Sequence, residues 1–175
     1  MAIKRPDKYH FTLRIIHWLM ALIILGLTFS GMYMVDMPKN ADKWQLYALH
    51  KSFGVVALIL ITLRILIKLF TVRPSMPSSF AKWERIVAHT SHTILYIGMI
   101  LIPLSGYLMS DFGDYGVKMF GLQMPDLFPK NEIGGAFHSF HVIAPYIMLG
   151  IIGLHIVGTL KHIFIDKHNI LRRMT

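Results

Sequence analysis

Four long apolar segments, separated by short charged stretches, dominate the sequence. Residues 15–35 carry no formal charge and would form a helix about 30 Å long, which matches the hydrocarbon thickness of a bilayer. The other segments are 46–70, 86–110 and 133–160, and the last two each contain one proline, which a helix bundle tolerates as a kink. The pattern predicts an all-α integral membrane protein, a bundle of four transmembrane helices.

Segment 46–70 carries cations near both of its ends: Lys51 near the start, and Arg64 and Lys68 near the finish. We expect these long side chains to snorkel to the membrane interfaces. The basic stretch before residue 15 resembles the start of a signal peptide, but the apolar run that follows is too long and shows no clear cleavage site. We therefore expect a retained anchor, and one membrane domain over 1–175.

Composition supports the membrane assignment and narrows the chemistry. The 175 residues are 54% hydrophobic and 15% charged, with a mean hydropathy of +0.53, whereas about a quarter of the residues of a soluble domain are charged. There is no cysteine, which excludes disulfides, iron–sulfur clusters and covalently attached c-type haem, so that any haem must be held non-covalently.

The charge distribution predicts the orientation in the membrane. Of the 18 Lys and Arg residues, 13 lie in 1–14, 64–85 and 161–175, so the positive-inside rule places both termini in the cytoplasm. The same rule accounts for the net charge of +9, and no nucleic-acid partner is predicted. Residues 111–132, rich in Gly, Pro and aromatic side chains, are expected to cover the outer end of the bundle.

Histidine is the residue type that carries candidate chemistry. The chain has ten histidines, and burying one in a membrane is costly unless it has a partner. A single buried histidine is equally well explained as a ligand or as a hydrogen-bonded helix contact. Five histidines lie within or at the ends of the apolar segments: His17, His50, His92, His141 and His155.

Four of these histidines form two pairs. His141 and His155 are 14 positions apart, which is about 21 Å of helix and nearly four whole turns, so they share a face at opposite depths. His17 lies at the depth of His155, and His50 at the depth of His141. Two neutral imidazoles on separate helices fit axial ligation of haem iron, whereas a bare metal ion would need more ligands. The pairs predict two haem b groups.

The histidines stand in motifs that resemble a known family. The motifs occur in order along the chain: Ile16-His17-Trp18-Leu19-Met20-Ala21, Leu49-His50-Lys51-Ser52, Ala88-x-x-x-His92, Phe120-Gly121-Leu122-x-x-Pro125 and His141-x13-His155. They are similar to the bacterial cytochrome b561 family over nearly the whole chain, although His168 stands where that family usually has an acidic residue. The resemblance implies a four-helix, two-haem, quinone-linked electron carrier, a multi-pass protein of the bacterial inner membrane.

Further residues are candidates for binding the cofactors. Haem propionates need cations, for which Arg14 and Lys51 are the natural choices, and Arg14 is equally well explained as a positive-inside anchor. His92 and His162, toward the cytoplasmic side, could frame ubiquinone and supply protons when it is reduced. The alternative of equal weight is that both are ordinary helix-end histidines.

Two functions follow from these features. The first is a quinone-linked oxidoreductase that passes electrons from a small external one-electron donor to ubiquinone in the membrane lipid; the resemblance adds superoxide as a candidate donor, and no catalytic residue is assigned. The second is a haem b membrane-anchor subunit that passes electrons between a dehydrogenase or hydrogenase partner and quinone. A structural bundle without a cofactor would leave several membrane histidines unpaired.

Overall fold

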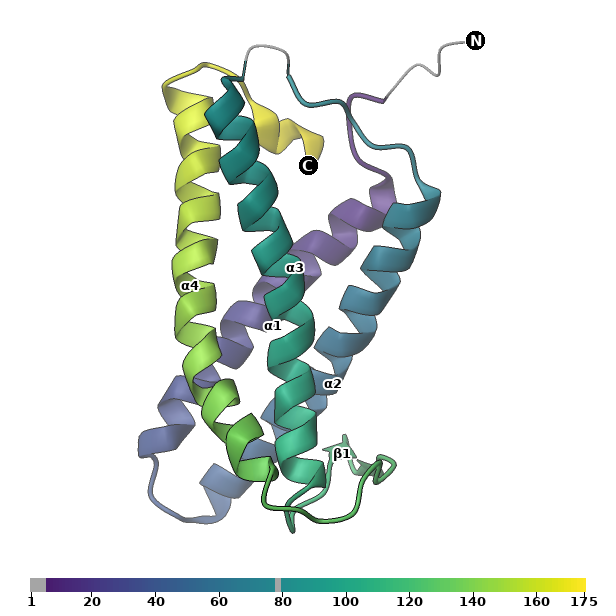
Figure 1. Ribbon diagram of the computed structural model, residues 1–175, viewed down its shortest axis with the longest axis vertical. Helices are drawn as coiled ribbons and strands as arrows, with labels where there is room; N and C mark the ends of the chain where they lie inside the picture. Colours follow the sequence, from purple (N-terminus) through teal and green to yellow (C-terminus); the bar gives the residue numbers. More distant parts are fainter. Residues whose placement is uncertain (1–5, 78–79) are drawn as a thin grey trace.

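Four long helices form the structure, a computed structural model that describes residues 6–77 and 80–175 (Figure 1). Each of them is long and apolar enough to cross a membrane. The predicted four-helix membrane bundle is confirmed. The elements follow the chain in the order α1 (Phe11–Asp36), α2 (Ala41–Phe70), α3 (Lys82–Asp111), β1 (Lys118–Met119), β2 (Leu122–Gln123), α4 (Gly134–Phe164) and the 3-10 helix η1 (Ile170–Arg173).

Most of the helices are longer than the apolar segments that predicted them, because polar residues form additional helical turns at their ends. α2 begins at Ala41, where the Asn40 side chain accepts a hydrogen bond from the backbone N–H of Lys43 at 3.0 Å and so satisfies one free donor of the first turn. The Nζ atom of Lys43 in turn donates to the carbonyls of Val35 and Met37 at the end of α1, at 3.2 and 2.8 Å. Such turns lie outside the hydrocarbon and are not visible in an apolar pattern.

Close packing joins α3 to α4, α1 to α2 and α2 to α3. Within the part of the chain that the structure describes, α4 has no extensive packing against α1 or α2. A small core cluster of Ile16, Met20 and Ile61 lies between α1 and α2. Many other large apolar side chains are exposed on the outside of the bundle, as expected of a surface that contacts lipid. Helix α4 therefore stands apart from the α1–α2 pair.

A small antiparallel hairpin lies at one end of the bundle, which we call the hairpin end (Figure 1). Lys118 pairs with Gln123, and the turn between the strands places Phe120 at φ 48° and Gly121 at φ 90°, the left-handed region that tight hairpin turns require. The hairpin docks on α2 through Ser52, whose hydroxyl accepts from the N–H of Phe120 at 2.9 Å.

The opposite end, which we call the terminal end, is closed by residues 165–175, the C-terminal strap. The strap turns back from α4 across the bundle toward the start of α1 (Figure 1). It is tied to three separate parts of the chain, so that α1, α4 and the α2–α3 connection are fixed relative to one another. Its hydrogen bonds join Tyr9 N to Arg173 O at 3.1 Å, Trp18 Nε1 to Met174 O at 2.9 Å, Arg14 to Thr175 O at 2.5 Å, and Arg173 to Ser75 O at 2.8 Å.

One buried carboxylate holds the segment between α3 and α4. Asp111, the last residue of α3, is 5% exposed and accepts hydrogen bonds from the backbone N–H groups of Leu127 and Phe128 at 3.0 Å each. Hydrogen bonds to a charged acceptor contribute more than neutral ones. We call residues 112–133, which lie between α3 and α4, the cover of the hairpin end; its position depends on the Asp111 side chain.

Replacing Asp111 with Ala should release the cover. Since two buried donors lose a charged acceptor, opening of residues 112–133 should become easier by about 2–3 kcal/mol. Hydrogen exchange of the Leu127 and Phe128 amides measures this directly and should accelerate strongly. Asp126, an exposed carboxylate in the same segment, provides the control Asp126→Asn, which should leave exchange unchanged. Equal exchange in the two variants would contradict the anchoring role.

Candidate functional site

The first predicted histidine pair is assembled at the hairpin end, between α2 and α4. His50 and His141 face each other with ring centroids 6.1 Å apart and ring planes at 88°. Both side chains are half-buried. The sequence paired these two residues by their depth in the membrane, and the fold brings their rings into contact.

Each imidazole of this pair is oriented through its Nδ1 atom. His141 Nδ1 lies 2.8 Å from the carbonyl oxygen of Ile102, and a carbonyl can only accept, so Nδ1 carries the proton. Ser30 Oγ lies 3.3 Å from His50 Nδ1 and donates its own proton to the carbonyl of Leu27, so it accepts from His50. In both rings Nε2 is left with a free lone pair, the arrangement typical of a metal-ligating histidine and its supporting hydrogen bond.

Two glycines allow the imidazoles to approach neighbouring helices. A Cβ at Gly106 would lie 2.6 Å from His141 Cε1, and one at Gly31 would lie 3.2 Å from His50 Cε1. Beside His50, an apolar cavity of about 360 Å³ opens between α1 and α2, with Gly26 and Phe53 in its lining. The sequence alone does not single out Gly31 and Gly106 among its 13 glycines.

The second predicted pair lies in the other half of α4. His17 of α1 and His155 of α4 have ring centroids 6.4 Å apart. The ring centroid of His92 on α3 lies 5.1 Å from that of His155, and the ring centroid of Trp18 lies 5.3 Å from that of His17. The terminal-end site thus gathers three histidines from three helices, whereas the hairpin-end site gathers two.

The spacing of both pairs fits a metal held between two imidazoles. A metal–imidazole bond is about 2 Å long and the ligating nitrogen lies about 1 Å from its ring centroid, so two axial imidazoles have centroids about 6 Å apart. The separations of 6.1 and 6.4 Å agree with this value. The space that separates α4 from α1 and α2 has apolar surroundings, so it suits a flat apolar group such as haem.

The two cations proposed for the haem propionates contact backbone carbonyls. Arg14 donates to the carbonyl of Thr175, and its Nε atom is buried without a partner in the described part of the chain. Lys51 donates to the carbonyl of Gly116 at 3.0 Å and lies over the ring of Tyr115. Each residue thus lies at the end of the bundle where the sequence places it.

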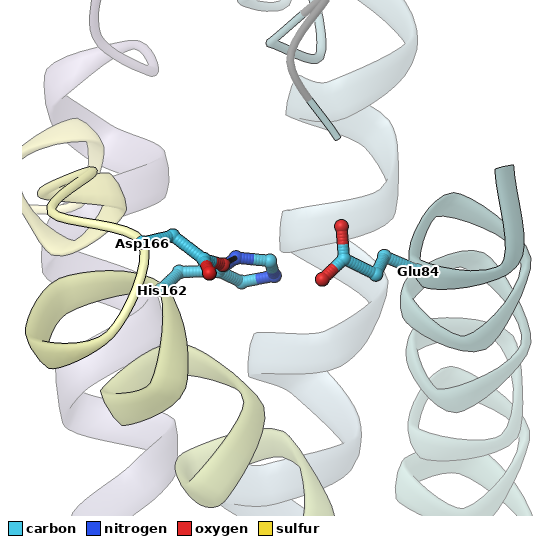
Figure 2. Close-up of side chains that lie close together, drawn as sticks. All are labelled: Glu84, His162 and Asp166. Atoms are coloured by element: carbon cyan, nitrogen blue, oxygen red, sulfur yellow. Dashed lines mark hydrogen bonds and ion pairs between the residues drawn. The ribbon is translucent and has the colours of Figure 1, made fainter. Parts of the chain in front are cut away.

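His162 lies in a charged cluster of the terminal end that sequence reasoning missed. Figure 2 shows Glu84 reaching from α3 toward His162 and Asp166. His162 Nδ1 lies 2.7 Å from Asp166 Oδ2, and the ring stacks on Phe80 at 4.0 Å. His92 instead neighbours His155, with ring centroids 5.1 Å apart. The four-residue spacing of His162 and Asp166 was a usable signal for this contact.

Lys161 neutralises the two carboxylates of this cluster. It forms ion pairs with Glu84 and with Asp166, and its hydrogen bond at 2.8 Å lowers the pKa of the Asp166 carboxyl group below the ordinary value. Oxygen and nitrogen atoms of Glu84, His162 and Asp166 lie close enough to bind one metal ion. The ammonium group already supplies the positive charge, so the cluster is an ionic lock between α3, α4 and the C-terminal strap.

Comparisons with known proteins agree with this geometry. The family model described as prokaryotic cytochrome b561 matches residues 8–175. "Cytochrome b561 homolog 2" of Escherichia coli K12 is 30% identical, with 97% of this chain and 92% of that protein covered. "Probable superoxide oxidase CybB" of Yersinia pestis is 28% identical, with 91% and 90% covered. "Cytochrome b561 homolog 1" of Escherichia coli K12 is 25% identical, with 96% and 97% covered.

Gly106→Ala should disturb the hairpin-end pair alone. The added methyl group would displace the His141 imidazole and its hydrogen bond to Ile102, and loss of such support weakens metal binding by about tenfold or more. Titration of haem into the protein, followed by absorbance, measures the change. Gly150→Ala on α4, the helix that carries His141, is the control, because a Cβ there meets no atom within 4 Å. If Gly106→Ala bound haem as the parent protein does, His141 would not depend on this close approach.

Proposed function

The chain belongs to the prokaryotic cytochrome b561 family, and from that premise we propose that it is a two-haem electron carrier linking an external one-electron donor to ubiquinone. Membership makes it a multi-pass membrane protein of electron transfer that binds haem b. The number of haems, the donor and the quinone are our proposals. The observation that carries them is the placement of two histidine pairs toward opposite ends of α4.

His50 with His141, and His17 with His155, would each hold one haem b. A haem held by two imidazoles would supply one-electron transfer, because small molecules could not readily reach the iron. The protein's own part is to fix the rings: Ser30 and the Ile102 carbonyl set the tautomers at the hairpin end, and the surrounding apolar side chains exclude water.

Superoxide is the donor we propose, on the strength of similarity to a protein named as a superoxide oxidase. Superoxide loses one electron to become O2, and ubiquinone takes two electrons and two protons to become quinol, so two donor molecules are needed for each quinol. By the positive-inside rule the terminal end faces the cytoplasm of a bacterium and the hairpin end faces the outside of its inner membrane. The donor would then meet the hairpin end.

We place ubiquinone beside the terminal-end pair. His92 is 5.1 Å from His155, so a quinone that contacts His92 would lie next to that pair and could receive a proton from the imidazole. His162 lies toward the same end, hydrogen-bonded to Asp166, and could pass protons from the cytoplasmic surface. Arg14 and Lys51 remain the cations proposed for propionates.

Haem content per chain, with a reduced-minus-oxidised spectrum, tests the proposal. His50→Ala and His141→Ala should each remove one b-type spectral component, and His17→Ala and His155→Ala should each remove the other, since each pair holds one haem. One haem per chain in the parent protein would exclude the two-site proposal. Loss of the same component from His50→Ala and His155→Ala would show that the pairs are assigned wrongly.

The quinone position is tested by replacing both His92 and His162 with Ala. Both haems should stay bound and reducible, while reoxidation by a soluble ubiquinone analogue should slow by about tenfold or more, because proton donors typically contribute that much. Stopped-flow absorbance measures reoxidation after reduction. His89→Ala, an exposed histidine one turn from His92, is the control. Unchanged reoxidation in the double variant would place the quinone elsewhere.

A further inference from the structure

Arg64 on α2 donates hydrogen bonds to two neighbouring helices. Its Nε atom donates to the hydroxyl of Tyr96 on α3 at 3.1 Å, and a terminal nitrogen donates to the carbonyl of Leu13 on α1 at 2.6 Å. The side chain thus connects three helices from its position on α2. Leu13 lies in the first turn of α1, so the guanidinium group reaches toward the terminal end of the bundle, the direction in which the sequence places it.

A second cation, Lys68, lies beside the same tyrosine. Its Nζ atom is 4.0 Å from the centroid of the Tyr96 ring, and it follows Arg64 by four residues, which places both on one face of α2. Like charges at this spacing repel each other. Over residues 6–77 and 80–175, the cations that form ion pairs are Lys130, Lys161 and His162, so no carboxylate there neutralises Arg64 or Lys68.

The two cations border the terminal-end histidine pair. Leu13, which accepts from Arg64, lies one helical turn before His17, and Tyr96 lies one turn after His92. The neighbouring core is strongly apolar, with Ile61 only 1% exposed. An unpaired positive charge in such surroundings is costly. The site therefore calls for an anion that the protein does not itself supply.

We propose that Arg64 and Lys68 bind a propionate carboxylate of the haem held by His17 and His155. A guanidinium group has five N–H donors, of which Arg64 uses two here, so donors remain for a carboxylate. Tyr96 accepts from Arg64 and keeps its own O–H to donate to the same anion. The inference rests on the proposed function, because it requires haem at the terminal-end pair.

Haem retention at the terminal-end site tests this assignment. Transfer of haem to an excess of apomyoglobin gives the dissociation rate, and His50→Ala removes the hairpin-end component so that one site is observed. Arg64→Gln in that background should release haem about tenfold faster or more, since a charged hydrogen bond is lost. Arg64→Lys, which keeps the charge, should fall between the two. Arg73→Gln, an exposed cation just beyond α2, should not change the rate.

The dimethyl ester of haem identifies the bound group, because its propionates carry no charge. With the ester, Arg64→Gln and the parent background should release the cofactor at the same rate. An equal effect of Arg64→Gln on haem and on the ester would overturn the proposal.

The phosphate of a lipid headgroup is also an anion that Arg64 could bind, and a second experiment distinguishes it from a propionate. If Arg64→Gln changed retention only in vesicles of phosphatidylglycerol and not in phosphatidylcholine, the ligand would be a lipid headgroup and the proposal would fail. If His17→Ala instead kept the terminal-end component, the haem site itself would be wrong, which is a failure of the proposed function and not of the Arg64 contact alone.

Discussion

The separation between α4 and the α1–α2 pair is the constraint on which the structure depends. Helices pack closely wherever apolar side chains interlock, yet over residues 6–77 and 80–175 the one long helix on which α4 packs extensively is α3. Across the remaining space its His141 and His155 face His50 and His17 at 6.1 and 6.4 Å. A space of that width would be unfavourable in a closely packed helix bundle, and the proposed haem groups would occupy it.

Keeping this separation requires both ends of the bundle to be fixed. At the hairpin end, Asp111 holds the cover by its hydrogen bonds to Leu127 and Phe128, and Ser52 connects the cover to α2. At the terminal end, the C-terminal strap contacts α1 and the α2–α3 connection. Lipid tails are as apolar as the helix surfaces, so the hydrophobic effect does not drive helices together in a membrane. Directional hydrogen bonds at the two ends therefore determine how the helices are spaced.

Three groups of cations at the terminal end differ in the partners that they contact. Lys161 is paired with Glu84 and Asp166, which locks α3 to the chain beyond α4. Arg14 binds a backbone carbonyl of the strap. Arg64 and Lys68 have no carboxylate among the described residues and surround Tyr96. The first arrangement links elements of the fold, while Arg14, Arg64 and Lys68 keep N–H donors that a ligand can use.

The sequence by itself determined the four helices and the two histidine pairs, because membrane thickness fixes helix length and a 14-residue spacing fixes both face and depth. It could not determine which carbonyl orients His141, that Gly106 makes room for its ring, or that His162 turns to Asp166 while His92 turns to His155. Nor could it show that Arg64 joins α2 to α1 and α3. Helical periodicity defines a direction around one helix, but the partner in that direction depends on how separate helices are rotated and spaced, which only tertiary packing decides.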